Sequence, residues 1–191
     1  FTLSGSNGSP KGYILKNQLA VLDMIYNNLW ERPIYFAVTT GPDSYMGLQQ
    51  FFRLEGLAYR LVPIQYPPNP NPNAYGGVAM DTMYENVMNK WSWGGMDNTE
   101  DGIYMDENNR RIATNLRLQI SNLAEALAQS GQVRKGLDVL ELLVRSTPSR
   151  NVPFDRIMLP AVELLSELAS DPNLGEEGRA QAAALAKEVG V

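Results

Sequence analysis

Any chemistry in this chain would have to come from carboxylates, hydroxyls and aromatic rings, because its 191 residues include neither cysteine nor histidine. Without these two residues there is no thiolate nucleophile, no imidazole base and no Cys- or His-ligated zinc or haem. The 21 acidic residues leave a glycosidase-type carboxylate pair open, but the sequence singles out no two of them. We therefore expect no cofactor, and whether the chain is an enzyme stays open.

For the alternative that the chain is an enzyme, we expect the active site in the segment 39–44 (Thr-Thr-Gly-Pro-Asp-Ser). It lies between a predicted strand and a predicted helix, where α/β proteins commonly bind ligands and where helix amides can hold an anion. The site residues there would be Asp43, Ser44 and Arg32. The segment lacks a Walker or dinucleotide glycine pattern, however, and we favour the simpler interpretation that Asp43 or Ser44 is a helix N-cap.

Three aromatic residues, Tyr84, Trp91 and Trp93, form a candidate binding site. Together with Tyr75 they lie close in sequence to a loop at 65–77 that is rich in proline and asparagine. Aromatic faces beside Asn and Asp side chains can stack on sugar rings or on an apolar partner surface. Tryptophan in a domain of this size more often packs in the core, and this is the interpretation that we favour.

The acidic turn at 97–102 resembles the opening of a calcium loop, with oxygen ligands at alternate positions and Gly102 in sixth place. The match then fails, because the twelfth position is Asn108 rather than a bidentate glutamate and Glu107 comes one residue early. We interpret this segment as a solvated turn that leads to a helix cap at Asp106, and we expect no metal site.

The first part of the chain, residues 1–105, has the pattern of a small α/β structure. Apolar residues at three- and four-residue steps predict a helix over 14–30, with Pro33 beyond its end. Strand-like runs at 34–38 and 57–64 flank a segment, 46–54, with helical spacing that Gly56 stops. Strand, helix, strand predicts a βαβ unit with parallel strands. A surface loop at 65–77 and a short helix over 82–90, capped by Asp81, follow.

Residues 106–191 are expected to be helical. Asp106 caps a helix through Ser130, a second helix ends near Arg145, and two more run over 154–169 and 176–189. The first two fit a tetratricopeptide repeat, whose small residues would be Ala124 and Gly136, although Leu143 is large for its position. We therefore predict an α+β fold that is mostly α, with a small βαβ-containing part followed by tetratricopeptide-like antiparallel helix pairs, the two parts packed as one unit.

Composition excludes several classes of partner. The net charge of −5 and the lack of a Lys or Arg cluster argue against nucleic acid, because binding that backbone requires clustered cations. No run approaches the roughly 18–20 apolar residues that span a bilayer, so we expect no membrane insertion. The start at Phe1, followed by a turn-rich stretch, suggests a piece of a longer protein.

Five segments resemble one family, the multi-pass membrane proteins long catalogued as a domain of unknown function and related to protein O-mannosyltransferases. The segments are Lys16-Asn17-Gln18, Leu22-Asp23-Met24, 27–37 (Asn-Asn-Leu-Trp-Glu-Arg-Pro-Ile-Tyr-Phe-Ala), 54–63 (Leu-Glu-Gly-Leu-Ala-Tyr-Arg-Leu-Val-Pro) and 106–111 (Asp-Glu-Asn-Asn-Arg-Arg). The resemblance implies a transmembrane bundle with a lipid-linked sugar transferase site, followed by an extracytoplasmic soluble region. Only that soluble region matches, and no catalytic residue is carried over.

From these observations we expect a non-catalytic accessory or interaction domain on the extracytoplasmic (periplasmic) side of a membrane. Its partner would be an acceptor protein, a glycan or its own transmembrane region. The alternative is an enzyme or glycan-binding domain with its site near 39–44. We expect Trp30, Arg32 and Tyr35 to serve structure, with Trp30 in the core and Arg32 paired with Asp23 or Glu55.

Overall fold

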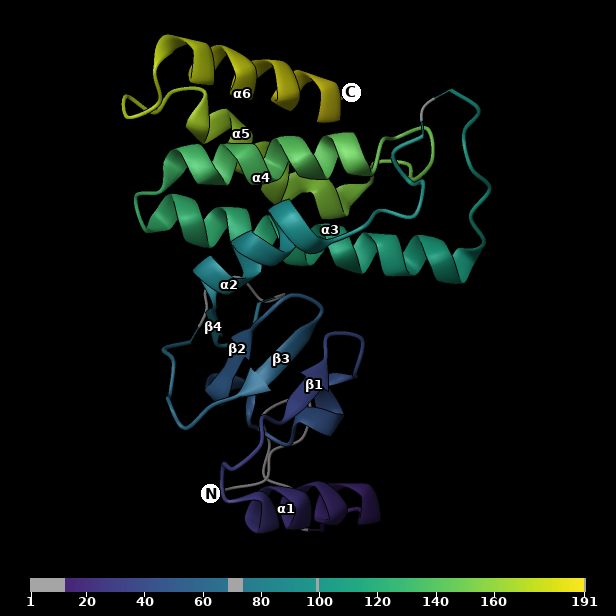
Figure 1. Cartoon of the computed structure of the whole chain (residues 1–191), viewed down its shortest axis with the longest axis vertical. Coiled ribbons are helices and arrows are strands. Elements are labelled where there is room, and N and C mark those ends of the chain that lie inside the picture. Colours follow the sequence, from purple (N-terminus) through teal and green to yellow (C-terminus); the bar gives the residue numbers. More distant parts are fainter. Residues whose placement is uncertain (1–12, 69–73, 99, 191) are drawn as a thin grey trace. The chain divides into compact units, whose positions relative to one another are not determined.

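The computed structural model describes residues 13–68, 74–98 and 100–190 (Figure 1). The chain divides into two compact units, residues 1–79 and residues 80–191. Residues 80–105 therefore pack with the helices, although the sequence analysis grouped them with the first part. Among the described residues, no helix combines the length and the hydropathy that crossing a membrane requires.

The first unit contains a four-stranded sheet with the order β1-β3-β2-β4. β1 (Tyr35–Ala37) and β2 (Phe52–Leu54) both pair antiparallel with β3 (Ala58–Leu61), and β2 pairs parallel with β4 (Gly77–Val78). The predicted parallel βαβ unit is wrong, because 46–54 contains a 3₁₀ turn, η2 (Gln49–Phe51), and the strand β2 in place of a helix. A second 3₁₀ turn, η1 (Pro42–Tyr45), precedes this segment. A hairpin turn at Gly56, whose φ is 115°, makes β2 and β3 adjacent and antiparallel.

One face of the sheet carries an aromatic core. Phe36, Phe52 and Tyr59 are buried at alternate strand positions, as the two-residue period of a strand requires. Tyr45 and Tyr75 pack edge-on against Tyr59, with ring centroids 6.1 and 5.8 Å away. These rings join the strands to the turns on either side of them, and they position the segment that follows the proline-rich loop.

The predicted N-terminal helix is α1 (Lys16–Asn28). It ends earlier than expected, because Leu29 and Trp30 adopt left-handed backbone conformations with φ of 45° and 65°. Gln18 fixes the helix start: its Oε1 accepts from the Leu15 amide at 3.1 Å. Its Nε2 donates to the Asp43 carbonyl at 3.2 Å, so this buried amide ties α1 to the 3₁₀ turn η1.

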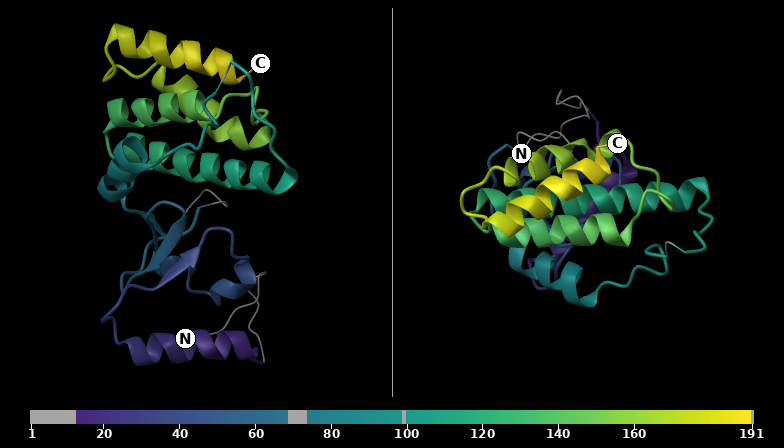
Figure 2. Two further views of the ribbon diagram at one scale, coloured as in Figure 1. Left: turned by 45° about the vertical axis from the view of Figure 1, so that its right-hand side comes forward. Right: turned by 90° about the horizontal axis from the view of Figure 1, so that it is seen from above.

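The second unit is helical, as predicted. Its helices stack on one another in Figures 1 and 2. In chain order its elements are α2 (Met80–Glu85), the π-helical turn η3 (Asn86–Lys90), α3 (Glu107–Gln129), α4 (Val133–Ser146), the 3₁₀ turn η4 (Arg156–Met158), α5 (Leu159–Leu168) and α6 (Glu176–Val189). The mostly helical α+β class is confirmed. Membership of the tetratricopeptide repeats stays a prediction.

Local signals explain the ends of these helices. Asp106 is the N-cap of α3, as predicted, and its Oδ1 accepts from the Asn109 amide at 2.8 Å. Asp81 is not a cap, because α2 already begins at Met80, and its carboxylate lies in the first turn instead. The expected helix over 154–169 begins only at Leu159, after η4, and Pro160 occupies its first turn.

The seam between α3 and α4 uses the small residues that the sequence analysis singled out. Both Ala124 and Gly136 are buried, and a Cβ added at Gly136 would lie 3.1 Å from the Ala124 carbonyl oxygen. The two helix backbones can approach this closely only because position 136 has no side chain.

A buried arginine holds the connection between α4 and α5. Arg117 of α3 is 2% exposed and donates to the Thr147 hydroxyl at 3.0 Å. It also donates to the carbonyls of Thr147, Val152 and Pro153, at 2.5, 2.6 and 3.1 Å. Its guanidinium lies 4.9 Å from the centre of the Phe154 ring. These contacts fix the irregular segment between the helix pairs onto α3.

Candidate functional site

The structure does not assemble the site that was considered for an enzyme at 39–44. Asp43 and Ser44 lie in the 3₁₀ turn η1, where Asp43 is exposed and Ser44 is half-buried. The N-cap of this turn is Gly41, so the prediction that Asp43 or Ser44 is the N-cap is wrong. Behind the turn, Tyr45 and Met46 are each 1% exposed and fill the space. Arg32 instead lines a separate cavity beside α1.

The aromatic candidates fall into separate groups. Trp91 and Trp93 pack edge-on with centroids 6.2 Å apart and are half-buried. The Tyr84 ring lies 5.2 Å from the Lys135 ammonium, and burial, followed by the charge of Asp138, raises its pKa. Tyr75 belongs to the other unit, where it packs in the aromatic core. The predicted cluster is therefore not one site within either unit.

The acidic turn at 97–102 is held by hydrogen bonds to its backbone. Asn98 Oδ1 accepts from the amide of Glu100 at 3.0 Å, and Asn151 Nδ2 donates to the carbonyls of Met96 and Asn98 at 2.8 and 2.6 Å. Within the described ranges no group of three or more acidic side chains could hold a metal ion. The Asn151 contacts attach the turn to the segment between α4 and α5.

The outer face of the sheet carries a charge network that sequence reasoning did not foresee. Glu55 accepts from Arg53 at 2.6 Å and from the Tyr35 hydroxyl at 2.9 Å, with Arg60 at 3.6 Å. Burial alone would raise the pKa of Glu55, but the hydrogen bonds from Arg53 and Tyr35 and the two positive charges lower it overall. Arg32 had been predicted to pair with Asp23 or Glu55. The structure instead pairs Glu55 with Arg53 and Arg60.

Trp30 is not a core residue, contrary to prediction, because 53% of it is exposed. Its left-handed backbone places it at the edge of an apolar cavity of about 280 Å³ rather than inside the packed face of α1. The lining residues, apart from Trp30, come from α1 and from the segments around the sheet: Leu22, Ile25, Leu48, Phe51, Leu61, Val62 and Pro63.

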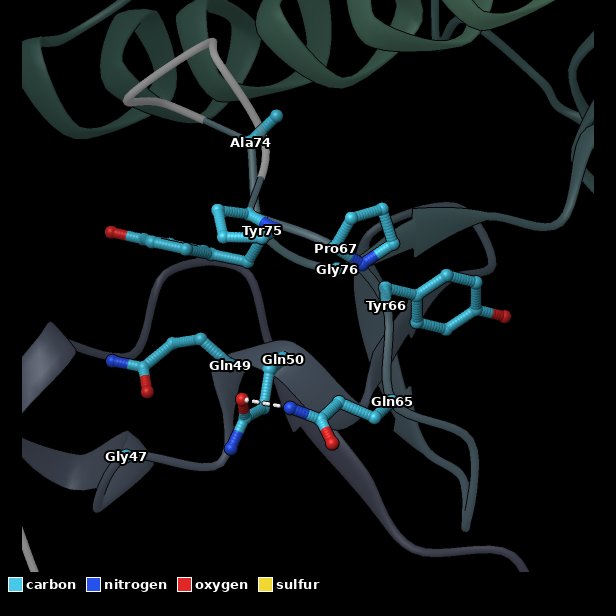
Figure 3. A pocket seen from close by; sticks show the side chains of 10 residues that line it. Gly47, Gln49, Gln50, Gln65, Tyr66, Pro67, Ala74, Tyr75 and Gly76 are labelled. Carbon is cyan, nitrogen blue, oxygen red and sulfur yellow. Dashed lines mark hydrogen bonds between the residues drawn. The ribbon is translucent and has the colours of Figure 1, made fainter.

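The candidate functional site is a larger cavity, of about 680 Å³, between η2 and the two ends of the proline-rich loop (Figure 3). We call it the glutamine–tyrosine pocket. Its lining combines three amides, two phenol rings, two prolines and small residues: Gln49, Gln50, Gln65, Tyr66, Tyr75, Pro67, Pro68, Gly47, Ala74 and Gly76. The volume is in the range of small-molecule sites, and none of these side chains carries a charge at neutral pH.

Backbone and side-chain contacts connect the segments that form the wall of this pocket. The Tyr66 amide donates to the Gln50 carbonyl at 2.8 Å, and Gln65 Nε2 donates to Gln50 Oε1 at 2.9 Å. Gly76, with φ of 61°, packs so closely on the backbone of Phe52 that a Cβ there would collide with it. A Cβ on Gly77 would collide with the Tyr66 ring. The two glycines therefore fix the position at which the chain enters β4 after the proline-rich loop.

The pocket presents paired donors and acceptors. Since Gln65 Nε2 and Gln50 Oε1 bond to each other, Gln50 Nε2 and Gln65 Oε1 have no further partner among the described residues. They offer one donor and one acceptor, and a hydroxyl group can use both. Tyr66, Tyr75 and the prolines add apolar parts to the lining, and the two tyrosine rings extend to opposite sides of the amide pair (Figure 3). Such a lining suits a neutral polyhydroxyl ligand, and its described residues include no strong nucleophile or general base.

Sequence reasoning found the loop at 65–77 but not the pocket beside it. Glutamines are unremarkable in sequence, and Gln49 and Gln50 fall in a segment that was predicted to be a helix. The signal that was available is Tyr75-Gly76-Gly77, since adjacent glycines after an aromatic residue indicate a close backbone approach.

Comparison with known proteins gives one match. Residues 7–82, fewer than half of the chain, match the model of a family described as TMEM260-associated domain 2. The match includes the strands and the described lining of the glutamine–tyrosine pocket, and it supports a domain associated with a membrane protein. No curated protein and no solved structure matches the chain significantly.

Proposed function

We propose that this chain is a non-catalytic accessory domain of a membrane-anchored protein and that the glutamine–tyrosine pocket binds a glycan. In this proposal the domain lies on the extracytoplasmic side and presents a saccharide, free or attached to an acceptor protein, to a glycosyl-transferring membrane region. The tetratricopeptide-like helix pairs would contact the acceptor protein or the transmembrane region.

The observation that supports this proposal most is the chemistry of the pocket lining. Sugar hydroxyls both donate and accept hydrogen bonds, and the amide pair of Gln50 and Gln65 can do the same. Sugar C–H faces pack on aromatic rings, which Tyr66 and Tyr75 supply. An uncharged lining would not compensate the charge of a phosphate or carboxylate, so a neutral saccharide is favoured over an anionic ligand.

An enzyme centred on 39–44 is the less favoured alternative. Tyr45 and Met46 occupy the space behind that turn, and Arg32 lies beside α1 rather than at the turn. The chain has no histidine or cysteine to act as base or nucleophile. The match to a membrane-protein-associated domain is also consistent with an accessory role.

Calorimetric titration of the chain with neutral mono- and disaccharides tests the proposal, with a sugar phosphate of similar size as the charged comparison. The double variant Gln50→Met, Gln65→Met keeps the side-chain volume but removes the donor and the acceptor. We expect saccharide affinity to fall by roughly tenfold, because the variant loses one donor and one acceptor and each hydrogen bond contributes ~0.5–1.5 kcal/mol.

Gln129→Met is the matched control, since Gln129 is an exposed glutamine of α3 in the second unit and its side-chain amide donates to Glu125. Its affinity for saccharide should equal that of the wild-type chain. Absence of saccharide binding, or equal loss in the control, would show that the pocket does not have this function. Preferred binding of the sugar phosphate would contradict the uncharged-ligand argument.

A further inference from the structure

α1 carries an apolar stripe that the described residues of its own unit do not cover. The stripe consists of Leu19, Leu22 and Tyr26, with Leu15 at the N-cap of the helix. The steps between these four residues are four, three and four, which is the heptad spacing of helices that pack in pairs. Leu19 and Tyr26 are 58% and 76% exposed, far more than ordinary helix residues of this type.

A different side of the helix faces the rest of the first unit. Gln18 bonds to the Asp43 carbonyl, and Ile25 lines the apolar cavity beside the sheet. At 100° per residue, Gln18 and Ile25 lie about 60–100° away from the centre of the stripe, and only Leu22 takes part in both faces. The stripe therefore remains available after α1 has packed on its own unit.

Two charged residues flank the stripe on its solvent side. Lys16 and Asp23 are seven residues apart, so they lie on the same edge of the helix, and both are exposed. They are the sole charged residues of α1. Asp23 also accepts from Asn27 Nδ2 at 3.0 Å, which holds the aspartate near the helix surface.

From this pattern we infer that the stripe is a self-association surface, on which α1 of a second copy packs antiparallel. In the register that sets Leu15 opposite Tyr26 and Leu19 opposite Leu22 of the second copy, Lys16 of each helix meets Asp23 of the other. A two-fold axis then forms both ion pairs at once and buries the whole stripe. Parallel packing would not bring Lys16 to Asp23, because the position that faces Asp23 is then Gln18 of the other helix.

A lipid surface is the other class of partner that an exposed apolar helix can have, and the charges argue against it. Helices that lie on membranes are rich in Lys and Arg on the polar face, whereas the polar face of α1 has one of each sign and a net charge of zero. The regular heptad step, rather than a broad apolar face, also fits a helix partner.

Sedimentation equilibrium of the full chain from micromolar to millimolar concentration tests this inference. The wild-type chain should form a dimer, and Leu19→Glu should abolish it without unfolding, because Leu19 is exposed. Met24→Glu is the matched control: Met24 is 57% exposed on the opposite face of α1, and this variant should dimerise as the wild type does. A monomer at all concentrations, or a dimer that tolerates Leu19→Glu, overturns the inference.

Charge substitution tests the antiparallel register separately. Lys16→Glu turns two attractions into two repulsions and should weaken the dimer by roughly tenfold, given the typical strength of exposed pairs. Adding Asp23→Lys should restore it. If the double variant stays weak, the antiparallel register is wrong. Co-sedimentation with neutral phosphatidylcholine vesicles that depends on Leu19 would instead assign the stripe to a membrane and overturn self-association.

Discussion

Replacing Arg117 with methionine should destabilise the second unit strongly. Methionine keeps the length and most of the apolar contacts of the side chain, so the change removes mainly the guanidinium and its hydrogen bonds. In the wild-type chain that group donates to one hydroxyl and three backbone carbonyls of the segment between α4 and α5. Burial lowers the pKa of Arg117 to about 10, far enough above 7 that the side chain stays charged at neutral pH.

The expected loss follows from the groups that are left without a partner. Each buried polar group without a hydrogen bond costs ~1–3 kcal/mol, and the carbonyls of Thr147 and Val152 accept the two shortest bonds from Arg117. Removing the buried charge offsets part of this cost, because the desolvation penalty of the cation disappears as well. We therefore expect Arg117→Met to lower the free energy of unfolding by ~3–5 kcal/mol.

Urea unfolding followed by circular dichroism at 222 nm and pH 7 measures this loss, since the second unit holds most of the helix. Arg145→Met is the matched control, because Arg145 lies on α4 and is exposed. The control should change stability by less than about 0.5 kcal/mol. If Arg117→Met is as stable as the control, the segment between α4 and α5 does not depend on the guanidinium, and the reasoning is refuted.

Three further substitutions have defined expectations. Gly136→Leu should cost ~1–3 kcal/mol by overpacking the seam at the Ala124 carbonyl, and chemical denaturation that shows parent-like stability would contradict the seam. Trp30→Ala should cost only ~1–2 kcal/mol in the same assay, less than a core tryptophan, because the ring is half exposed. Folding lowers the pKa of Glu55, so the ionised carboxylate stabilises the folded state. This stabilisation is fully present above the ordinary pKa of 4.5 and is lost as pH falls through the pKa of the folded state. Thermal melts should therefore show a smaller loss of stability in acid for Glu55→Gln than for the wild-type chain, and equal losses would exclude this role.

Features set by local sequence were the ones that could be predicted. The Asp106 cap, the end of α3 near Ser130 and the small residues at the α3–α4 seam each depend on contacts within one helix or between neighbours in sequence. Their residue types allow few alternatives. The helical half of the fold followed from such signals.

The sheet could not be predicted in the same way. The segment 46–54 has apolar residues at Leu48, Phe51 and Leu54, a spacing that suits a helix as well as a turn followed by a strand. Pairing of β2 with β3 across the Gly56 turn decides between them, and that pairing depends on tertiary contacts. The position of Trp30 was missed for a related reason, because two consecutive left-handed residues end α1 early and turn the ring outward.

The glutamine–tyrosine pocket was outside the reach of sequence reasoning. Its amides come from residues 49–50 and 65, which a strand pair separates, and no spacing rule connects them. The aromatic residues Tyr84, Trp91 and Trp93, which were considered for stacking, lie in the other unit, with Trp91 packed on Trp93. Only the fold of the first unit shows that Tyr75 and Tyr66 line the same cavity.

Residue-resolved NMR of the ¹⁵N-labelled chain, titrated with a neutral disaccharide, is the most direct test of glycan binding at the glutamine–tyrosine pocket. We expect the largest shifts in amide resonances at residues 47–50, 65–66 and 74–76, with the side-chain amides of Gln50 and Gln65 among them. Shifts confined to the segment 39–44 or to Trp91 and Trp93, or no shifts with any saccharide, would contradict it.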